Sequence, residues 1–166
     1  MMCQKEGCEG ENYRLEDGTT VELGININSA EFETLEQSYD FVGLVRTEFL
    51  YMEYEDFPTE EEQFRMYRDV LKRASGKTVI LRTLDIGEDK MLPYISGPCG
   101  GNEKTLRGLE FCFANSDVFL TQLRAMLRAS AYGSLQIMFP MVKDLEDICK
   151  AKDFVEQAKV QLEREG

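Results

Sequence analysis

The stretch FVGLVRTEFLYMEYEDFPTEEEQF, residues 41–64, indicates a strand followed by a helix. Its first five residues form a short apolar run that predicts a buried strand. Arg46 ends this run, so a guanidinium that cannot be neutralised lies where the strand ends. Further along, Thr59 and Glu62 have the spacing of a capping box, which predicts that a helix starts there. The stretch is therefore one βα unit with a charge at its junction.

The same order of strand and helix occurs four times along the chain. Strands are predicted at 20–27, 41–45, 78–84 and 134–141, and helices at 30–38, 59–74, 105–113, 116–131 and 144–164. The run at 78–84 is continuous and β-branched, which is typical of a strand buried on both faces. The last helix is expected to bury Leu145, Ile148, Ala151, Val155, Ala158 and Leu162.

This order predicts an α/β fold of four βα units with parallel strands. Two architectures remain open, an open sheet and half of a TIM-type (βα)8 barrel. A complete barrel has typically about 250 residues, so length alone favours the open sheet. The residues at the strand ends favour the half barrel.

Length and charge limit the classes of function. With 166 residues, of which 43% are hydrophobic, the chain can bury a core of its own. Residues 1–19 are predicted to be a polar tail or lead-in, and residues 20–166 a partial βα-barrel domain. The formal charge of −12 repels phosphate backbones and anionic lipids. Nucleic acid and membrane surfaces are therefore poor candidate partners.

Cysteine and histidine usage adds two expectations. The five cysteines are odd in number and scattered, and no secretory signal or apolar span precedes them. This favours reduced thiols in a cytoplasmic protein. The chain contains no histidine, so a mechanism that needs an imidazole cannot run on this chain alone.

Two arginines stand at the ends of neighbouring strands. Arg46 ends the second strand and Arg82 lies near the end of the third. Ligand sites of parallel α/β folds form at the carboxyl ends of strands, and arginine pairs well with phosphate or carboxylate oxygens. The two arginines are therefore candidates for an anion clamp. The alternative is an ion pair of Arg46 with Glu48 or Asp85, which would neutralise the strand ends without a ligand.

Four motifs in order carry a resemblance to a known family. They are GLVRTEFLYM with PTEEEQF and a following tyrosine (43–67), ILRTLDIGEDKMLPY (80–94), QLRAMLRASAYG (122–133) and LQIMFPM (135–141). Together they resemble Enzyme I of the bacterial sugar phosphotransferase system, the phosphoenolpyruvate–protein phosphotransferase. The resemblance runs from about residue 21 to residue 166, and it covers the first half of the family's C-terminal phosphoenolpyruvate-binding barrel.

The resemblance implies a phosphoryl transferase. Arg46 and Arg82 would hold the phosphate of phosphoenolpyruvate, and Arg107 matches a further arginine near that site. The phosphoryl group would pass to a histidine on a separate N-terminal domain and then to the histidine-containing phosphocarrier protein. The family's Mg²⁺ ligands and catalytic cysteine fall outside this chain, so no complete catalytic or metal site is expected here. The chain alone is expected to be inactive and to depend on further segments.

Departures from the family pattern keep a second function open. Glu110 stands where the family has an arginine, and a glutamate near a phosphate should repel substrate. The alternative is thus a non-catalytic half barrel that binds a phosphorylated metabolite or acts as a regulatory module. An immediate stop codon downstream would favour it over a fragment of the transferase. Either form is expected to self-associate, because a half barrel exposes two strand edges.

Overall fold

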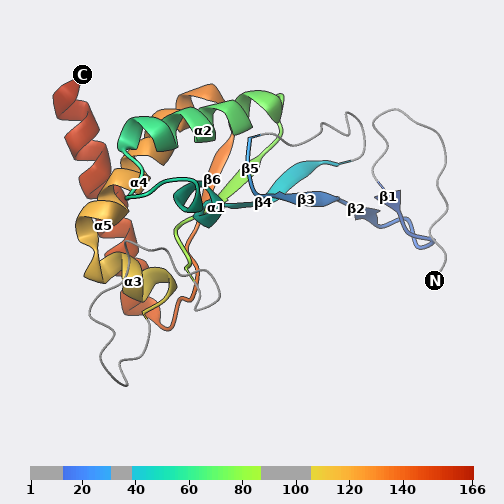
Figure 1. Ribbon diagram of the computed structural model, residues 1–166. Coiled ribbons are helices and arrows are strands. Elements are labelled where there is room, and N and C mark those ends of the chain that lie inside the picture. Colours follow the sequence, from blue (N-terminus) through green and yellow to red (C-terminus); the bar gives the residue numbers. More distant parts are fainter. Residues whose placement is uncertain (1–12, 31–38, 87–105) are drawn as a thin grey trace.

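The computed structural model describes residues 13–30, 39–86 and 106–166 (Figure 1). The strands are β1 (Tyr13–Arg14), β2 (Thr20–Val21), β3 (Gly24–Ile27), β4 (Phe41–Arg46), β5 (Val79–Arg82) and β6 (Leu135–Met138). The helices are α1 (Glu48–Met52), α2 (Glu60–Arg73), α3 (Gly108–Ala114), α4 (Ser116–Ala129), η2 (Ser130–Tyr132, a 3₁₀ turn) and α5 (Leu145–Glu165).

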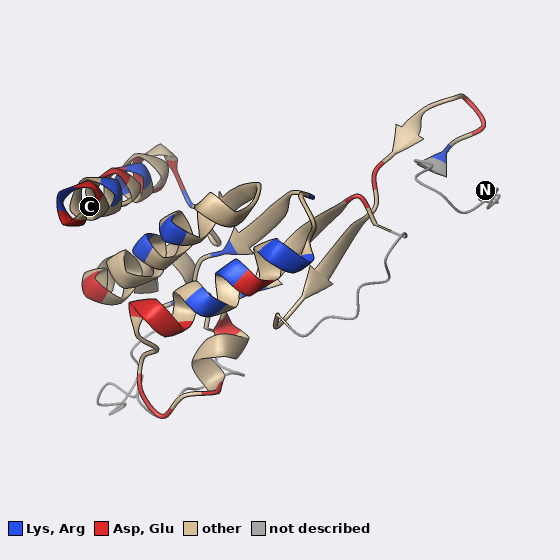
Figure 2. Cartoon of the chain, turned by 90° about the horizontal axis from the view of Figure 1, so that it is seen from above, with Lys and Arg blue, Asp and Glu red and all other residues tan. Residues whose placement is uncertain are grey.

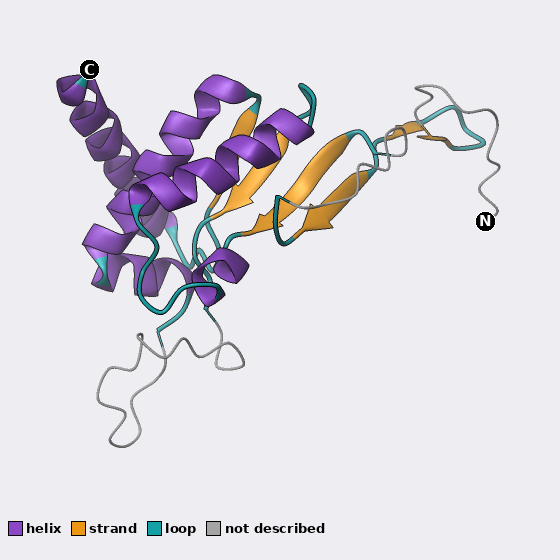
Figure 3. Ribbon diagram, turned by 45° about the horizontal axis from the view of Figure 1, so that its top comes forward, coloured by secondary structure: helices purple, strands orange, loops and turns teal. Residues whose placement is uncertain are grey.

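The main sheet has four strands in the order β3-β4-β5-β6, and every neighbouring pair is parallel. Among the described residues, helices follow β4, β5 and β6 along the chain. The predicted α/β class with four parallel strands is therefore confirmed, and its order is that of half of a TIM-type barrel. Figure 3 shows the helices gathered beside the sheet, with the β1–β2 hairpin extending away from it.

The first predicted strand is divided in two. Thr20 and Val21 pair antiparallel with β1, whereas Gly24–Ile27 alone joins the parallel sheet. Between these pieces, the backbone N–H of Leu23 donates to a carboxylate oxygen of Asp40 at 2.6 Å. The single strand predicted at 20–27 is thus wrong in extent, because a side-chain contact interrupts its ladder. The helix predicted at 30–38 lies largely outside the described residues.

Helix α2 forms as its sequence predicts. The Thr59 hydroxyl accepts from the backbone N–H of Glu62 at 3.3 Å, and the Glu62 carboxylate accepts from the backbone N–H of Thr59 at 2.7 Å. These bonds satisfy donors that a helix start leaves without partners. The apolar side chains of this helix are buried in the core: Phe64, Tyr67, Val70, Leu71 and Ala74.

Strand β5 buries one of its faces fully. In β5, Val79 and Leu81 are inaccessible, whereas Ile80 and Arg82 are only half-buried. Successive side chains of a strand point to opposite faces, so the helices cover the face of Val79 and Leu81. The expectation that β5 is buried on both faces is therefore wrong. A sheet with one partly open face, which carries Arg82, fits a half barrel better than a doubly covered open sheet.

Helix α5 packs through its small residues. Ala151 and Ala158 are fully buried, and Phe154 stacks on Phe113 with ring centroids 5.9 Å apart. Leu145, which the helical pattern placed inward, is 76% exposed. That expectation is wrong because α5 contacts the core from its second turn onward, and Leu145 lies in the first turn, beyond this contact.

Helices α2, α4 and α5 are joined by ion pairs. Arg124 of α4 contacts Glu60 at 2.6 Å and Glu165 at 2.5 Å, and Arg128 contacts Glu60 at 2.7 Å and Glu61 at 2.9 Å. Figure 2 shows charged positions of both signs along these helices. The hydrogen bonds that Arg124 donates to Glu165 and Glu60 raise the pKa of Arg124 above its usual value. The two arginines are structural, and we do not assign them to a ligand site.

Candidate anion site

The two strand-end arginines occupy equivalent positions. Arg46 of β4 is the register partner of Arg82 of β5. In a parallel sheet, partners in register project from the same face, so both side chains leave the sheet on its partly open face. The register thus places Arg46 and Arg82 side by side at the carboxyl end of the sheet, as the sequence predicts.

Arg46 is half-buried and is held by an amide. Its Nη1 donates to Oδ1 of Asn28 at 3.1 Å. Asn28 directly follows β3, so this contact links the carboxyl ends of two neighbouring strands. Among residues 13–30, 39–86 and 106–166, Arg46 has no ion pair. The predicted alternative, in which Glu48 or Asp85 neutralises Arg46, is therefore not what the described residues form.

Those two carboxylates bind Arg82 instead. Nη2 of Arg82 contacts Oε1 of Glu48 at 2.5 Å, and its Nη1 contacts Oδ2 of Asp85 at 3.3 Å. Only 17% of the Arg82 side chain is exposed, against 1% for Glu48 and 8% for Asp85. Two buried carboxylates on different elements thus fix the plane of the guanidinium. This leaves the Arg82 group oriented before any ligand arrives.

Arg107 reaches the same edge from the start of α3. Its Nη2 contacts Oδ1 of Asp85 at 3.4 Å, so Asp85 lies between Arg82 and Arg107. The Arg107 side chain is 44% exposed and is the most accessible of the three. The structure therefore brings all three predicted arginines to the carboxyl end of the sheet, two of them through one shared carboxylate.

Glu110, expected to repel an anion, has a basic partner. A carboxylate oxygen of Glu110 lies 2.8 Å from Nζ of Lys143, in the loop between β6 and α5. The hydrogen bond that Lys143 donates to Glu110 raises the pKa of Lys143. The negative charge is thus compensated locally, which removes the reason for expecting repulsion at this position.

The described thiol nearest the site is inert. Cys112 of α3 is buried and its Sγ lies 3.7 Å from the carbonyl oxygen of Leu84. Burial, with the nearby charge of Asp85, raises the pKa of Cys112 to about 12. A neutral thiol is a poor nucleophile. Cys99 lies outside the described residues.

The described residues do not fit a magnesium site. No group of three or more acidic, cysteine or histidine side chains among them could hold a metal ion. The two carboxylates at the strand ends already contact arginines, as shown by the distances above. Mg²⁺ prefers carboxylates with free oxygens, together with water. No step of a reaction at this site is therefore assigned to a metal ion held by the described residues.

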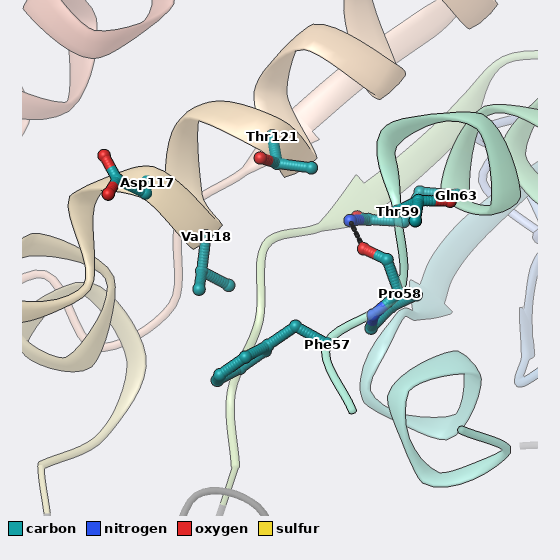
Figure 4. A pocket seen from close by; sticks show the side chains of 7 residues that line it. All are labelled: Phe57, Pro58, Thr59, Gln63, Asp117, Val118 and Thr121. Atoms are coloured by element: carbon teal, nitrogen blue, oxygen red, sulfur yellow. Dashed lines mark hydrogen bonds between the residues drawn. The ribbon is translucent and has the colours of Figure 1, made fainter. Parts of the chain in front are cut away.

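Two hollows lie away from the arginines. One, of about 230 Å³, lies between the loop before α2 and the first turns of α4 (Figure 4). Its lining residues are Phe57, Pro58, Thr59, Gln63, Asp117, Val118 and Thr121. A second, of about 530 Å³, begins at Asn28 and extends over α1 and α2. Neither is lined by Arg46, Arg82 or Arg107, so neither is the anion site.

Membrane insertion finds no support in the described helices. Even α5, which has 21 residues, carries too many charges to lie across a lipid bilayer.

Comparison with known proteins gives a family match along almost the whole chain. The model of the PEP-binding domain of PEP-utilising enzymes matches residues 4–166. The chain is 49% identical over 153 residues to the phosphoenolpyruvate-protein phosphotransferase of Priestia megaterium, covering 90% of this chain and 27% of the relative. It is 45% identical over 164 residues to the protein of that name in Listeria innocua, covering 97% and 29%. For the protein of that name in Bacillus subtilis, identity is 46% over 153 residues, with 90% and 27% covered. The chain thus spans under a third of the length of these relatives, and the resemblance drawn from its motifs is confirmed.

Proposed function

Because this chain belongs to the PEP-utilising enzymes through their PEP-binding domain, we propose that Arg46 and Arg82 bind the phosphate of phosphoenolpyruvate. The observation that carries this role is the register of the two arginines, which are direct partners at the carboxyl ends of β4 and β5. Two neighbouring guanidinium groups on one face of the sheet can both donate hydrogen bonds to the oxygens of one phosphate. Arg107 would add a third, more mobile donor at the rim.

The local charge balance supports an anion. Arg82 and Arg107 contact the two carboxylates, Glu48 and Asp85, whereas Arg46 contacts neither. Among these described residues the arginine charges therefore outnumber the carboxylate charges by one. The rest of the protein is strongly acidic, with a formal charge of −12. A small positive site in an acidic protein concentrates small anions at that point and discourages polyanions.

In the whole protein, this site would present the phosphoryl group for transfer. The arginines would neutralise its charge while the P–O bond to the enolate oxygen breaks, and positioning of this kind dominates phosphoryl transfer. The acceptor lies elsewhere, since this chain has no histidine. We propose a histidine on another domain as acceptor and the histidine-containing phosphocarrier protein as the next one. A cytoplasmic location belongs to the same proposal.

Calorimetric titration of phosphoenolpyruvate into the chain and its Arg46→Met variant tests this function. One lost charge-assisted hydrogen bond is worth about 1.5–3 kcal/mol. We therefore expect the variant to bind roughly 10- to 100-fold more weakly. The matched control is Arg65→Met, which removes one charge from an exposed position of α2 whose ion pair is with Glu61 of the same helix. Equal affinity for Arg46→Met and the parent would remove Arg46 from the site.

We also propose that the chain self-associates through its sheet edges. β3 and β6 each have one neighbour in the main sheet, and the residues after β6 expose Met141, Val142 and Leu145. Unpaired edges beside apolar side chains favour association. Gel filtration with light scattering should detect a dimer at micromolar concentration. The dimeric fraction should rise with salt concentration, because salt screens the repulsion between the acidic chains. A clean monomer at every salt concentration would contradict this.

A further inference from the structure

A chain of buried polar groups joins α4 to both arginine-bearing strand ends. Gln122 of α4 is 1% exposed. Its Nε2 donates to Oγ1 of Thr47 at 3.1 Å, and its Oε1 accepts from the backbone N–H of Leu84 at 2.9 Å. The Thr47 hydroxyl in turn donates to the backbone carbonyl of Arg82 at 2.8 Å.

These bonds attach to the backbone at defined points. Thr47 directly follows Arg46, and Leu84 is two residues beyond Arg82. One side chain of α4 and one hydroxyl therefore tie the end of β4 to the end of β5. Thr47, Gln122 and Leu84 are buried, and a buried donor or acceptor without a partner costs about 1–3 kcal/mol in general. The hydrogen bonds of such a network can all form in one register of the two strand ends, and any other register would break some of them.

We propose that Thr47 and Gln122 form a positioning brace that sets the two phosphate-binding arginines at their working separation without touching the ligand. This rests on the proposed function of Arg46 and Arg82. The brace also bears on Glu48, which follows Thr47 in α1 and contacts Arg82. A shift of Thr47 would move Arg46 and Glu48 together, so both the spacing of the arginines and the orientation of Arg82 depend on it.

Nε2 of Gln122 also donates to the hydroxyl of Tyr67 at 3.2 Å, and the remote end of the network beyond Tyr67 supplies a control. Gln63 of α2 is 1% exposed, accepts from the hydroxyls of Tyr51 and Tyr67, and donates to the carbonyl of Pro58 at 2.9 Å. It is as buried and as polar as Gln122, yet it contacts neither strand end in the described residues. Gln63→Met should therefore cost stability as Gln122→Met does, without moving the arginines.

The test uses the full chain and four variants. Thr47→Val removes the hydroxyl at nearly constant volume, and Thr47→Ser keeps it. Gln122→Met and Gln63→Met form the matched pair. Calorimetry measures phosphoenolpyruvate affinity, and NMR records the Nε–Hε signal of Arg82 without ligand. We expect Thr47→Val and Gln122→Met to bind at least tenfold more weakly and to shift the Arg82 signal. Thr47→Ser and Gln63→Met should stay within about twofold of the parent, well below the tenfold step of one hydrogen bond.

The outcomes separate this brace from the proposed function. Equal affinities for Thr47→Val and Gln63→Met, with an unchanged Arg82 signal in both, would overturn the brace. Should Gln122→Met fail to fold, the near-isosteric Thr47→Val decides alone. If the parent does not bind phosphoenolpyruvate, the proposed function fails. The brace is then judged by the Arg82 signal, which must shift in Thr47→Val and not in Gln63→Met.

Discussion

Replacing Arg82 with methionine is expected to lower the free energy of unfolding by about 3–5 kcal/mol and to abolish measurable phosphoenolpyruvate binding. The first effect follows from burial, since Arg82 contacts Glu48, which is 1% exposed, and Asp85, which is 8% exposed. Removing one partner of a buried ion pair leaves the other charge poorly compensated. The second effect follows from the loss of the proposed phosphate-binding guanidinium that Glu48 and Asp85 hold in place.

A double variant separates the two effects. Arg82→Met with Glu48→Gln replaces the buried carboxylate by a neutral amide of the same shape. We expect denaturant titration to show that part of the stability returns, because no uncompensated charge remains at that position. Calorimetry should show that binding does not return. A double variant that regained affinity would show that Arg82 serves the fold and not the ligand. A loss below 1 kcal/mol in the single variant would contradict the ion-pair account.

The arginines could be predicted from the sequence because each ends or nearly ends an apolar run. Parallel strands align their carboxyl ends, so two charges at those ends had to meet at one edge. Their partners could not be predicted in the same way. Glu48 lies in α1, which has only five residues and too little periodicity to indicate a helix. The sequence alone thus allowed Glu48 as a partner of Arg46. In the structure, α1 places the Glu48 carboxylate against Arg82 instead.

The brace was missed for a related reason. Gln122 precedes Leu123 on a helix with a clear apolar face. The helical pattern alone does not predict whether a polar residue at that position is buried. Its role depends on a threonine 75 residues earlier in the chain. Such contacts join elements that are far apart in the sequence, and a periodic pattern reports only on the element that carries it. A glutamine beside the apolar stripe of a well-formed helix is nevertheless a usable signal for a buried polar network.

Placing any side chain at Gly108 is expected to destabilise the fold and to displace Arg107 from the site. Gly108 has φ +54°, a left-handed conformation that costs another residue about 1–2 kcal/mol. A Cβ there would lie 2.8 Å from Cβ of Met141 and 2.9 Å from the carbonyl oxygen of Pro140. Overpacking of this kind adds about 1–3 kcal/mol. Gly108→Ala should therefore lower the free energy of unfolding by about 2–5 kcal/mol, the sum of these two costs.

Gly76 provides the matched control for this prediction. Its φ is +86°, also left-handed, but an added Cβ would meet nothing within 4 Å. Gly76→Ala should thus show the conformational cost of about 1–2 kcal/mol alone. Because Arg107 directly precedes Gly108, only Gly108→Ala should also weaken phosphoenolpyruvate binding, by roughly tenfold for one lost charge-assisted bond. Denaturant titration and calorimetry measure the two effects separately. If Gly108→Ala loses stability and keeps full affinity, Arg107 takes no part in binding, and the site consists of Arg46 and Arg82.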